Sequence, residues 1–157
     1  MIKIICVGRI KEKYNQDAIN EYKKRISRFS KLEIIEVKYF PSKDNASPLD
    51  IEKVKDQEGE EILSKIKDEY VIALESDGIE LDSISFSDKI DKVFTNVGST
   101  LTFVIGGSLG LSSSVLKRSN YTMSFSKLTF PHQLFRVILL EQIYRAFKIL
   151  NNEPYNK

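Results

Sequence analysis

Apolar residues in this chain recur in short runs that alternate with longer stretches of helical spacing. Strand-like runs cover residues 2–7, 32–40, 70–75 and 100–105, and residues 121–125 form a weaker one. Apolar positions three and four apart predict helices over residues 12–29, 50–67, 83–96, 112–118 and 131–150. This alternation predicts an α/β fold with a mostly parallel sheet and helices on both faces. No linker or repeat divides the chain, so we expect a single domain over residues 1–157.

Turn-forming and capping residues separate these elements. Asp77 and Gly78 predict a turn within residues 76–81, and Asp50 is expected to cap the helix that follows it. Pro131 fits the first turn of the last helix, where its missing N–H costs nothing.

The last predicted helix has almost no polar face. Its apolar residues are Leu134, Phe135, Val137, Ile138, Leu139, Leu140, Ile143, Tyr144, Ala146, Phe147, Ile149 and Leu150. A helix that is apolar all round needs burial on every side, and in a small chain a second copy supplies that cover most simply. We therefore expect a homodimer through this helix. A central core helix within a monomer is the alternative.

The net charge of +2 hides a strong segregation of charge along the chain. Residues 1–31 carry nine Lys and Arg against three acids, and residues 113–157 carry seven against two. Two basic ends around an acidic centre indicate a polyanion-binding surface if the fold brings them to one face. Solvated helix faces explain the same pattern equally well.

Cysteine content and hydropathy indicate the cellular compartment of the protein. Cys6 is the only cysteine and lies in an apolar run, so it is expected to be a small core residue in a reducing compartment. No secretory leader is evident, and no stretch approaches the roughly 20 apolar residues that span a bilayer. These features predict a soluble protein of the cytoplasm that makes no membrane contact.

Glycines 106, 107 and 110 follow a predicted strand and precede a helix, a usual position for ligand binding in α/β proteins. They match neither the dinucleotide-binding nor the P-loop pattern, and turn glycines with positive φ explain them equally well. His132 is the only histidine, so neither a zinc site nor a Cys-His nucleophilic pair is supported, and no metal is expected.

Several longer blocks resemble one family. They are residues 103–111 (FVIGGSLGL), 124–137 (SFSKLTFPHQLFRV), 141–147 (EQIYRAF) and 154–155 (PY), and the opening residues 5–12 (ICVGRIKE) fit as well. Together they closely resemble the RlmH-type large-subunit rRNA pseudouridine N3-methyltransferases of the SPOUT superfamily. The resemblance runs nearly end to end, and the blocks occur in the family's order.

This resemblance implies a deep trefoil knot near the C-terminus, S-adenosylmethionine as methyl donor, and 23S rRNA in the large subunit or the whole ribosome as substrate. The implied donor-binding residues are Leu74, Gly106, Gly107, Phe125, Ser126, Lys127, Leu128, Thr129 and Phe130. Backbone groups of the glycine turn and of the loop over residues 126–129 would bond the adenine edge. Leu74, Leu128 and Phe130 would form apolar walls.

Three residues are the candidates for catalysis. His132 is the group best suited to take the weakly acidic N3 proton, and Arg145 would stabilise developing negative charge or grip a phosphate. Tyr155 would stack on or hydrogen-bond the flipped nucleotide. The family usually ends Pro-Tyr-His-Lys/Arg, whereas this chain has Asn156 at the histidine position, so a proton-transfer role assigned to that histidine cannot operate here.

The basic ends supply the candidate RNA contacts, Arg9, Lys23, Lys24, Arg25 and Lys157. Two other functions share parts of this pattern. A non-catalytic RNA-binding α/β module would have the basic ends but no need for the glycine turn and the loop over residues 125–130. A nicotinamide- or flavin-binding protein should carry an early phosphate-binding glycine loop, which Gly8 alone does not provide.

Overall fold

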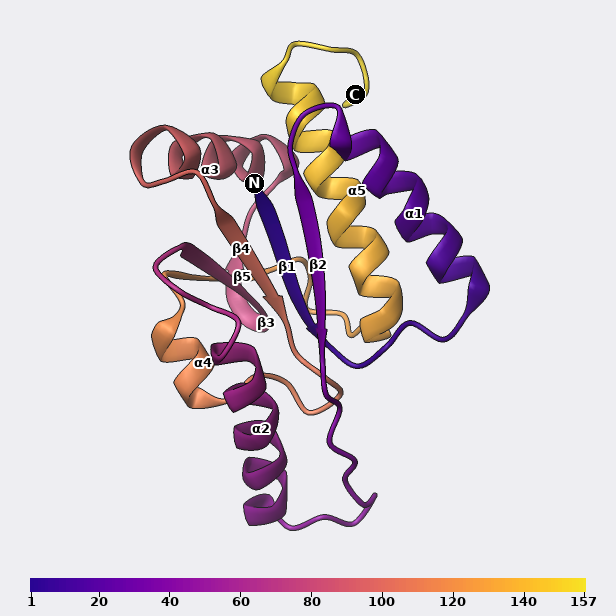
Figure 1. The fold of residues 1–157 in the computed structure, drawn as a ribbon, viewed down its shortest axis with the longest axis vertical. Coiled ribbons are helices and arrows are strands. Elements are labelled where there is room, and N and C mark those ends of the chain that lie inside the picture. The colour runs from indigo at the N-terminus through magenta and orange to yellow at the C-terminus, as the bar shows by residue number, and fades with distance from the viewer.

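The computed structural model describes residues 1–157 and has one sheet of five parallel strands in the order β2-β1-β4-β3-β5 (Figure 1). The strands are β1 (Ile2–Val7), β2 (Leu32–Val37), β3 (Tyr70–Glu80), β4 (Leu101–Ile105) and β5 (Tyr121–Ser124). The helices are α1 (Lys13–Ser27), α2 (Pro48–Leu63), α3 (Ser83–Asn96), α4 (Ser113–Arg118) and α5 (His132–Leu150).

Helices cover both faces of the sheet, which confirms the predicted α/β architecture. On one face, α5 packs between α1 and α3, and on the other face α2 packs against α4 (Figure 1). Because both faces are covered, side chains of either orientation along a central strand are buried, as all six residues of β1 are. This double burial explains why the strands read as continuous apolar runs rather than as alternating patterns.

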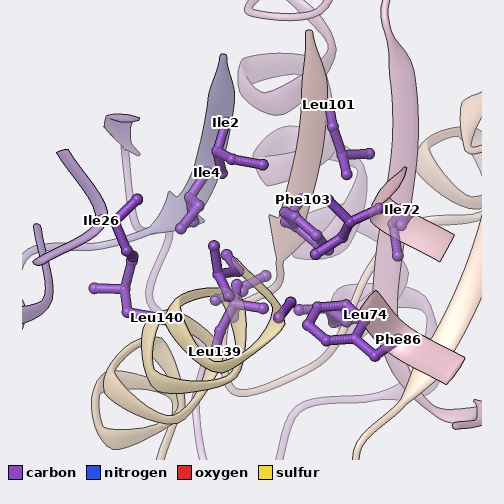
Figure 2. Close-up of a cluster of buried hydrophobic side chains, with 14 of the residues drawn as sticks. Ile2, Ile4, Ile26, Ile72, Leu74, Phe86, Leu101, Phe103, Leu139 and Leu140 are labelled. Atoms are coloured by element: carbon purple, nitrogen blue, oxygen red, sulfur yellow. The ribbon is translucent and has the colours of Figure 1, made fainter. Parts of the chain in front are cut away.

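The larger core lies between the sheet and the layer formed by α1, α3 and α5. Ile2 and Ile4 of β1 meet Leu139 and Leu140 of α5 there, and Phe103 of β4 completes the contact (Figure 2). The smaller core lies on the opposite face, beneath α2 and α4. Cys6 is fully buried in the larger core, as predicted, and burial raises the pKa of its thiol to about 12.

The predicted end of β3 and both predicted ends of α2 are wrong. Strand β3 does not stop at Glu75 but continues to Glu80, because its register against β5 shifts between Leu74 and Ile79 and pairing then resumes. The segment expected to be a turn is therefore largely strand. Helix α2 begins at Pro48, since the side chain of Ser47 rather than that of Asp50 caps it by accepting the Asp50 N–H, at 3.2 Å. The helix also ends at Leu63, before the expected Lys67.

Helix α5 obtains most of its burial within one chain. Its buried residues face the sheet and the neighbouring helices α1 and α3, which is the alternative considered for this apolar helix. Leu134 is 41% exposed, so an apolar part of the helix remains open. No helix of the chain, α5 included, has the length and apolar content needed to cross a membrane.

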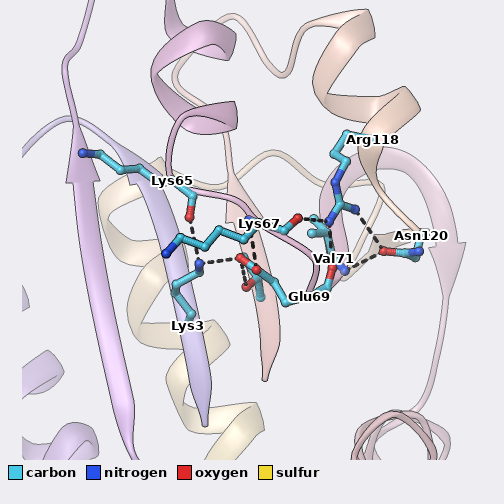
Figure 3. A network of polar contacts seen from close by, with 8 residues as sticks. Lys3, Lys65, Lys67, Glu69, Val71, Arg118 and Asn120 are labelled. Carbon is cyan, nitrogen blue, oxygen red and sulfur yellow. Dashed lines mark hydrogen bonds and ion pairs between the residues drawn. The ribbon is translucent and has the colours of Figure 1, made fainter. Parts of the chain in front are cut away.

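A polar network closes the edge of the sheet where the parallel strands begin (Figure 3). Lys3 pairs with Glu69, and Arg118 donates to the backbone carbonyls of Lys67 and Glu69 at 2.8 and 2.9 Å. Burial disfavours the charged form of Glu69, but the hydrogen bond from Lys3 outweighs it together with other bonds, so the pKa of Glu69 is lowered. These contacts join the segments before β3 and β5, so the network has a structural role at the edge where the strands start.

Candidate functional site at the carboxyl ends of the strands

A cleft of about 460 Å³ opens where β4 and β5 end and where β3 leaves the core after Leu74. This size falls within the range of small-molecule sites, and the carboxyl edge of a parallel sheet is where α/β proteins bind ligands. The lining residues come from the ends of these strands, the glycine turn after β4, the loop after β5 and the start of α5. They are Leu74, Glu75, Ser76, Ile105, Gly106, Gly107, Ser108, Leu109, Gly110, Met123, Ser124, Phe125, Ser126, Leu128, Thr129, Phe130, His132 and Phe135.

The glycine turn folds back on itself beside the cleft. Gly110 N–H donates to the Gly107 carbonyl at 3.1 Å, and Gly110 has a φ of +90°, which favours glycine. A Cβ on Gly106 would lie 2.9 Å from the carbonyl carbon of Gly110. Positive φ is therefore a feature of Gly110 and not of Gly106 or Gly107, which corrects the sequence interpretation. Gly106 is needed because two backbone segments approach closely.

The loop after β5 is shaped by serines and backed by aromatic rings. Ser126 accepts from the Leu128 N–H at 3.0 Å through its hydroxyl, and its own carbonyl accepts from the Ser124 hydroxyl at 2.9 Å. Phe135 of α5 contacts the rings of Phe125 and Phe130, with centroids 5.0 and 6.1 Å apart. This aromatic cluster holds the loop against the start of α5 and gives the cleft an apolar wall.

Eight of the nine residues predicted to bind the donor line this cleft; the exception is Lys127, which is exposed and does not contribute to the lining. The structure thus brings together segments that are far apart in the sequence, near residues 74, 106 and 125–130. The lining residues that the sequence prediction missed include Glu75, Ser76, Met123 and Phe135. Glu75 directly follows Leu74 and was a findable candidate, because a polar residue at the end of a buried parallel strand points to this edge.

His132, the first residue of α5, is half-buried at the cleft. Burial and the positive charge of Arg136 one turn along the helix lower the pKa of His132 below its usual value. Arg136 is almost fully buried, donating to the carbonyls of Val7 and Gly8 at 2.9 and 2.7 Å and to Glu36 at 2.7 Å. The imidazole is therefore neutral at physiological pH and able to accept a proton.

This lowered pKa leads to a prediction about pH dependence. If neutral His132 accepts the substrate proton, the single-turnover rate falls only when the pH drops below about 6.5, where imidazole becomes protonated. The acidic limb of the profile should lie below the ordinary histidine range, and His132→Ala should remove this limb along with most of the rate. An unchanged acidic limb in His132→Ala would assign the titration to another group.

Arg145 and Tyr155 do not lie at the cleft of their own chain. Arg145 follows His132 along α5 by roughly 20 Å, at about 1.5 Å per residue. Its guanidinium pairs with Glu141, donates to Asn156 at 3.1 Å and lies over the Tyr155 ring at 4.7 Å. The predicted catalytic group is therefore not assembled within one chain.

Tyr155 and Arg145 instead form part of a polar and aromatic cluster. The Tyr155 hydroxyl donates to Glu141 at 3.2 Å, and its ring packs edge-on against Tyr144 at 5.0 Å. Burial, with the nearby Glu141 carboxylate, raises the pKa of Tyr155 to about 12, so it acts as a hydrogen-bond donor rather than as a base. The buried Nε of Arg145 has no partner.

The predicted RNA-binding residues occupy two regions. Arg9 is exposed just after β1, at the same edge of the sheet as the cleft. Lys23, Lys24 and Arg25 are exposed near the end of α1, where the Arg25 guanidinium lies 5.7 Å from the Tyr144 ring. Lys157 is exposed at the C-terminus. The cations at the end of α1 therefore lie beside Tyr144, near the end of α5 that is away from the cleft.

Comparisons with known proteins agree with this geometry. Curated relatives include ribosomal RNA large subunit methyltransferase H of Clostridium tetani, 58% identical, and that of Clostridium botulinum strain Alaska E43, 57% identical. In both cases the similarity covers 99% of this chain and 99% of the relative. A solved structure of a probable methylase family protein from Haemophilus influenzae has a TM-score of 0.54 and 12% identity, covering 99% of this chain and 70% of that one, which shows a shared fold.

Residues 1–156 match a family described as predicted SPOUT methyltransferase. The match covers the sheet, the glycine turn, the loop after β5 and the whole of α5. With its cleft formed by those segments, this chain belongs to the SPOUT methyltransferase family.

Proposed function

We propose that this methyltransferase transfers a methyl group from S-adenosylmethionine to N3 of a pseudouridine in 23S rRNA, in the assembled ribosome. The observation that carries the proposal is the cleft beside the middle of β3 and the carboxyl ends of β4 and β5, in a chain whose full-length relatives bear the name ribosomal RNA large subunit methyltransferase H. That substrate would place the enzyme in the cytoplasm. The family also implies a trefoil knot around this cleft, and that threading stays a prediction.

The cleft suits an adenosyl ligand. The glycine turn and the loop after β5 present backbone groups that can bond an adenine edge, while Leu74 and Phe130 offer apolar walls. The donor would supply an activated methyl group on a sulfonium. Transfer is then an in-line displacement, for which the protein mainly aligns the acceptor and excludes water.

His132 is proposed to prepare the acceptor. Loss of the weakly acidic imide proton makes N3 a better nucleophile, and a neutral imidazole beside the cleft can accept that proton. Asn156 cannot take this role, because an amide does not titrate, but it orients Arg145 through the 3.1 Å hydrogen bond.

A homodimer would complete the site. Apolar side chains remain exposed on α3, on the loop after β5 and on α5, with exposed fractions of 57% for Ile84, 73% for Leu128 and 41% for Leu134. If two copies of α5 pack side by side and antiparallel, the Arg145 end of one lies beside the His132 end of the other. Arg145 and Tyr155 of the second copy could then meet the nucleotide bound at the first.

The basic residues are proposed to hold the RNA backbone. Arg9 lies at the same edge of the sheet as the cleft, while the end of α1 combines exposed cations with the rings of Tyr22 and Tyr144, a combination that suits RNA. In the antiparallel dimer, this second region would also lie near the cleft of the other copy.

Neutralising the end of α1 should therefore weaken binding of rRNA rather than binding of the donor. For the combined change Lys23→Gln, Lys24→Gln and Arg25→Gln, we expect the log–log salt slope of RNA affinity to fall by about one for each phosphate that the variant no longer neutralises. Donor affinity, measured by calorimetry, should be unchanged, because these residues lie outside the cleft.

The matched control neutralises three exposed lysines on other helices, Lys53 of α2, Lys92 of α3 and Lys117 of α4. It makes the same change in net charge and should leave the salt slope near that of the wild type. An equal fall in slope in both triple variants would mean that net charge, rather than a defined surface on α1, drives RNA binding.

A ligand-binding experiment distinguishes the proposed activity from the two alternative functions. Calorimetry should detect S-adenosylmethionine and S-adenosylhomocysteine at micromolar affinity and should detect neither NAD nor FMN. Binding of NAD or FMN instead would indicate a dinucleotide or flavin protein. RNA binding without any adenosyl ligand would indicate a non-catalytic RNA-binding module.

A further inference from the structure

Glu75 is a cleft residue to which the proposed function gives no role. It directly follows Leu74, the last buried residue of β3, and is half-buried, and its Oε1 accepts the Leu111 N–H at 2.8 Å. A Cβ on Gly110 would lie 3.3 Å from Oε1 and 3.9 Å from Oε2, so the carboxylate lies against the glycine turn. Leu111 uses one oxygen only, which leaves Oε2 for a ligand.

The charge inside the cleft is negative. Among the lining residues, Glu75 is the only carboxylate and His132 the only other ionisable side chain. Lys127 of the neighbouring loop is exposed and does not line the cleft. Glu75 is therefore the only carboxylate that a ligand in this space of about 460 Å³ would meet.

We propose that Glu75 makes this cleft selective for the positively charged sulfonium of the methyl donor over the uncharged thioether of the product. The proposal rests on the proposed function, because it concerns the same ligand. Methyl transfer removes the sulfonium charge, and with it the attraction of the carboxylate for the ligand. Glu75 would therefore help to retain the donor and favour exchange of the product.

The expected size of the effect follows from Coulomb's law. A unit charge about 6 Å from the carboxylate, in a partly solvated cleft, changes affinity by about tenfold. Glu75→Gln keeps the shape of the side chain and an oxygen that can accept the Leu111 N–H, but it removes the charge. This substitution separates the electrostatic role from the support of the glycine turn.

Three probes carry the test, and calorimetry measures the affinity of each. S-adenosylmethionine has a sulfonium, sinefungin has an ammonium group in its place, and S-adenosylhomocysteine has a neutral thioether. Glu75→Gln should weaken the first two by about tenfold and change S-adenosylhomocysteine by less than about threefold. Glu75→Asp, which keeps the charge, should retain most of the wild-type preference.

Asp77→Asn is the matched control, because Asp77 is an exposed acid two residues further on that does not line the cleft. It should change none of the three affinities. Equal weakening of all three probes by Glu75→Gln would overturn the proposal and assign Glu75 to the ribose or to the turn. Unchanged affinities would overturn it as well. A wild-type protein that bound none of the probes would refute the proposed function itself.

Discussion

Gly106→Val should abolish donor binding while the protein still folds. A Cβ at this position would lie 2.9 and 3.0 Å from the backbone C and O of Gly110, and 3.1 Å from a methyl group of Leu111. The glycine turn would have to open, and its backbone groups would leave the positions that face the cleft. We expect affinity for S-adenosylmethionine to fall by at least about 100-fold, which is about 2.7 kcal/mol.

Gly98→Val is the matched control for this change. Gly98 lies between α3 and β4, and a Cβ there would meet nothing within 4 Å. Calorimetry with the donor and thermal unfolding should be run on both variants. A folded Gly106→Val protein with nearly normal affinity would remove the glycine turn from the donor site.

Mixing two inactive variants should restore about a quarter of the wild-type activity. His132→Ala damages the cleft end of α5, and Arg145→Ala damages the other end, roughly 20 Å away. If each site takes His132 from one copy and Arg145 from the other, a mixed dimer keeps one intact site. Random exchange makes about half of the dimers mixed, and each of these carries one working site of two.

Single-turnover methylation of ribosomes by the mixture measures this recovery, with each variant alone as the baseline. The two variants must be unfolded and refolded together, or coexpressed, so that subunits exchange. Recovery no greater than the sum of the separate variants would mean that His132 and Arg145 act within one chain or that Arg145 has no catalytic part.

The sequence was sufficient to predict the layers of the fold. Strands buried on both faces leave continuous apolar runs, such as residues 2–7, and amphipathic helices leave a period of 3.6. Local signals failed where tertiary pairing decides the outcome. The segment around Gly78 reads as a turn, yet β3 continues through it because β5 offers a partner for Ile79 and Glu80.

For the candidate site, too, some residues could be predicted from the sequence and others could not. Family resemblance located the glycine turn and the loop over residues 125–130, and parallel strand order explains why they meet at one edge of the sheet. It did not reveal that Glu75 lines the cleft, although the place of Glu75 after Leu74 could have suggested it, nor that Arg136 is buried one turn from His132. The burial of Arg136 depends on contacts with β1 and β2, which are distant in the sequence. The distance between His132 and Arg145 follows from the length of α5, and the helix predicted over residues 131–150 already implied that separation.

The most direct test of the proposed activity is nucleoside analysis after methylation in vitro. Ribosomes from cells in which the gene for this chain is deleted would be incubated with the protein and S-adenosylmethionine carrying a deuterated methyl group. The large-subunit rRNA would then be digested and examined by mass spectrometry. We predict near-stoichiometric label in N3-methylpseudouridine and none with Gly106→Val. Absence of label from the wild-type reaction, or label in a different nucleoside, would contradict the proposed activity.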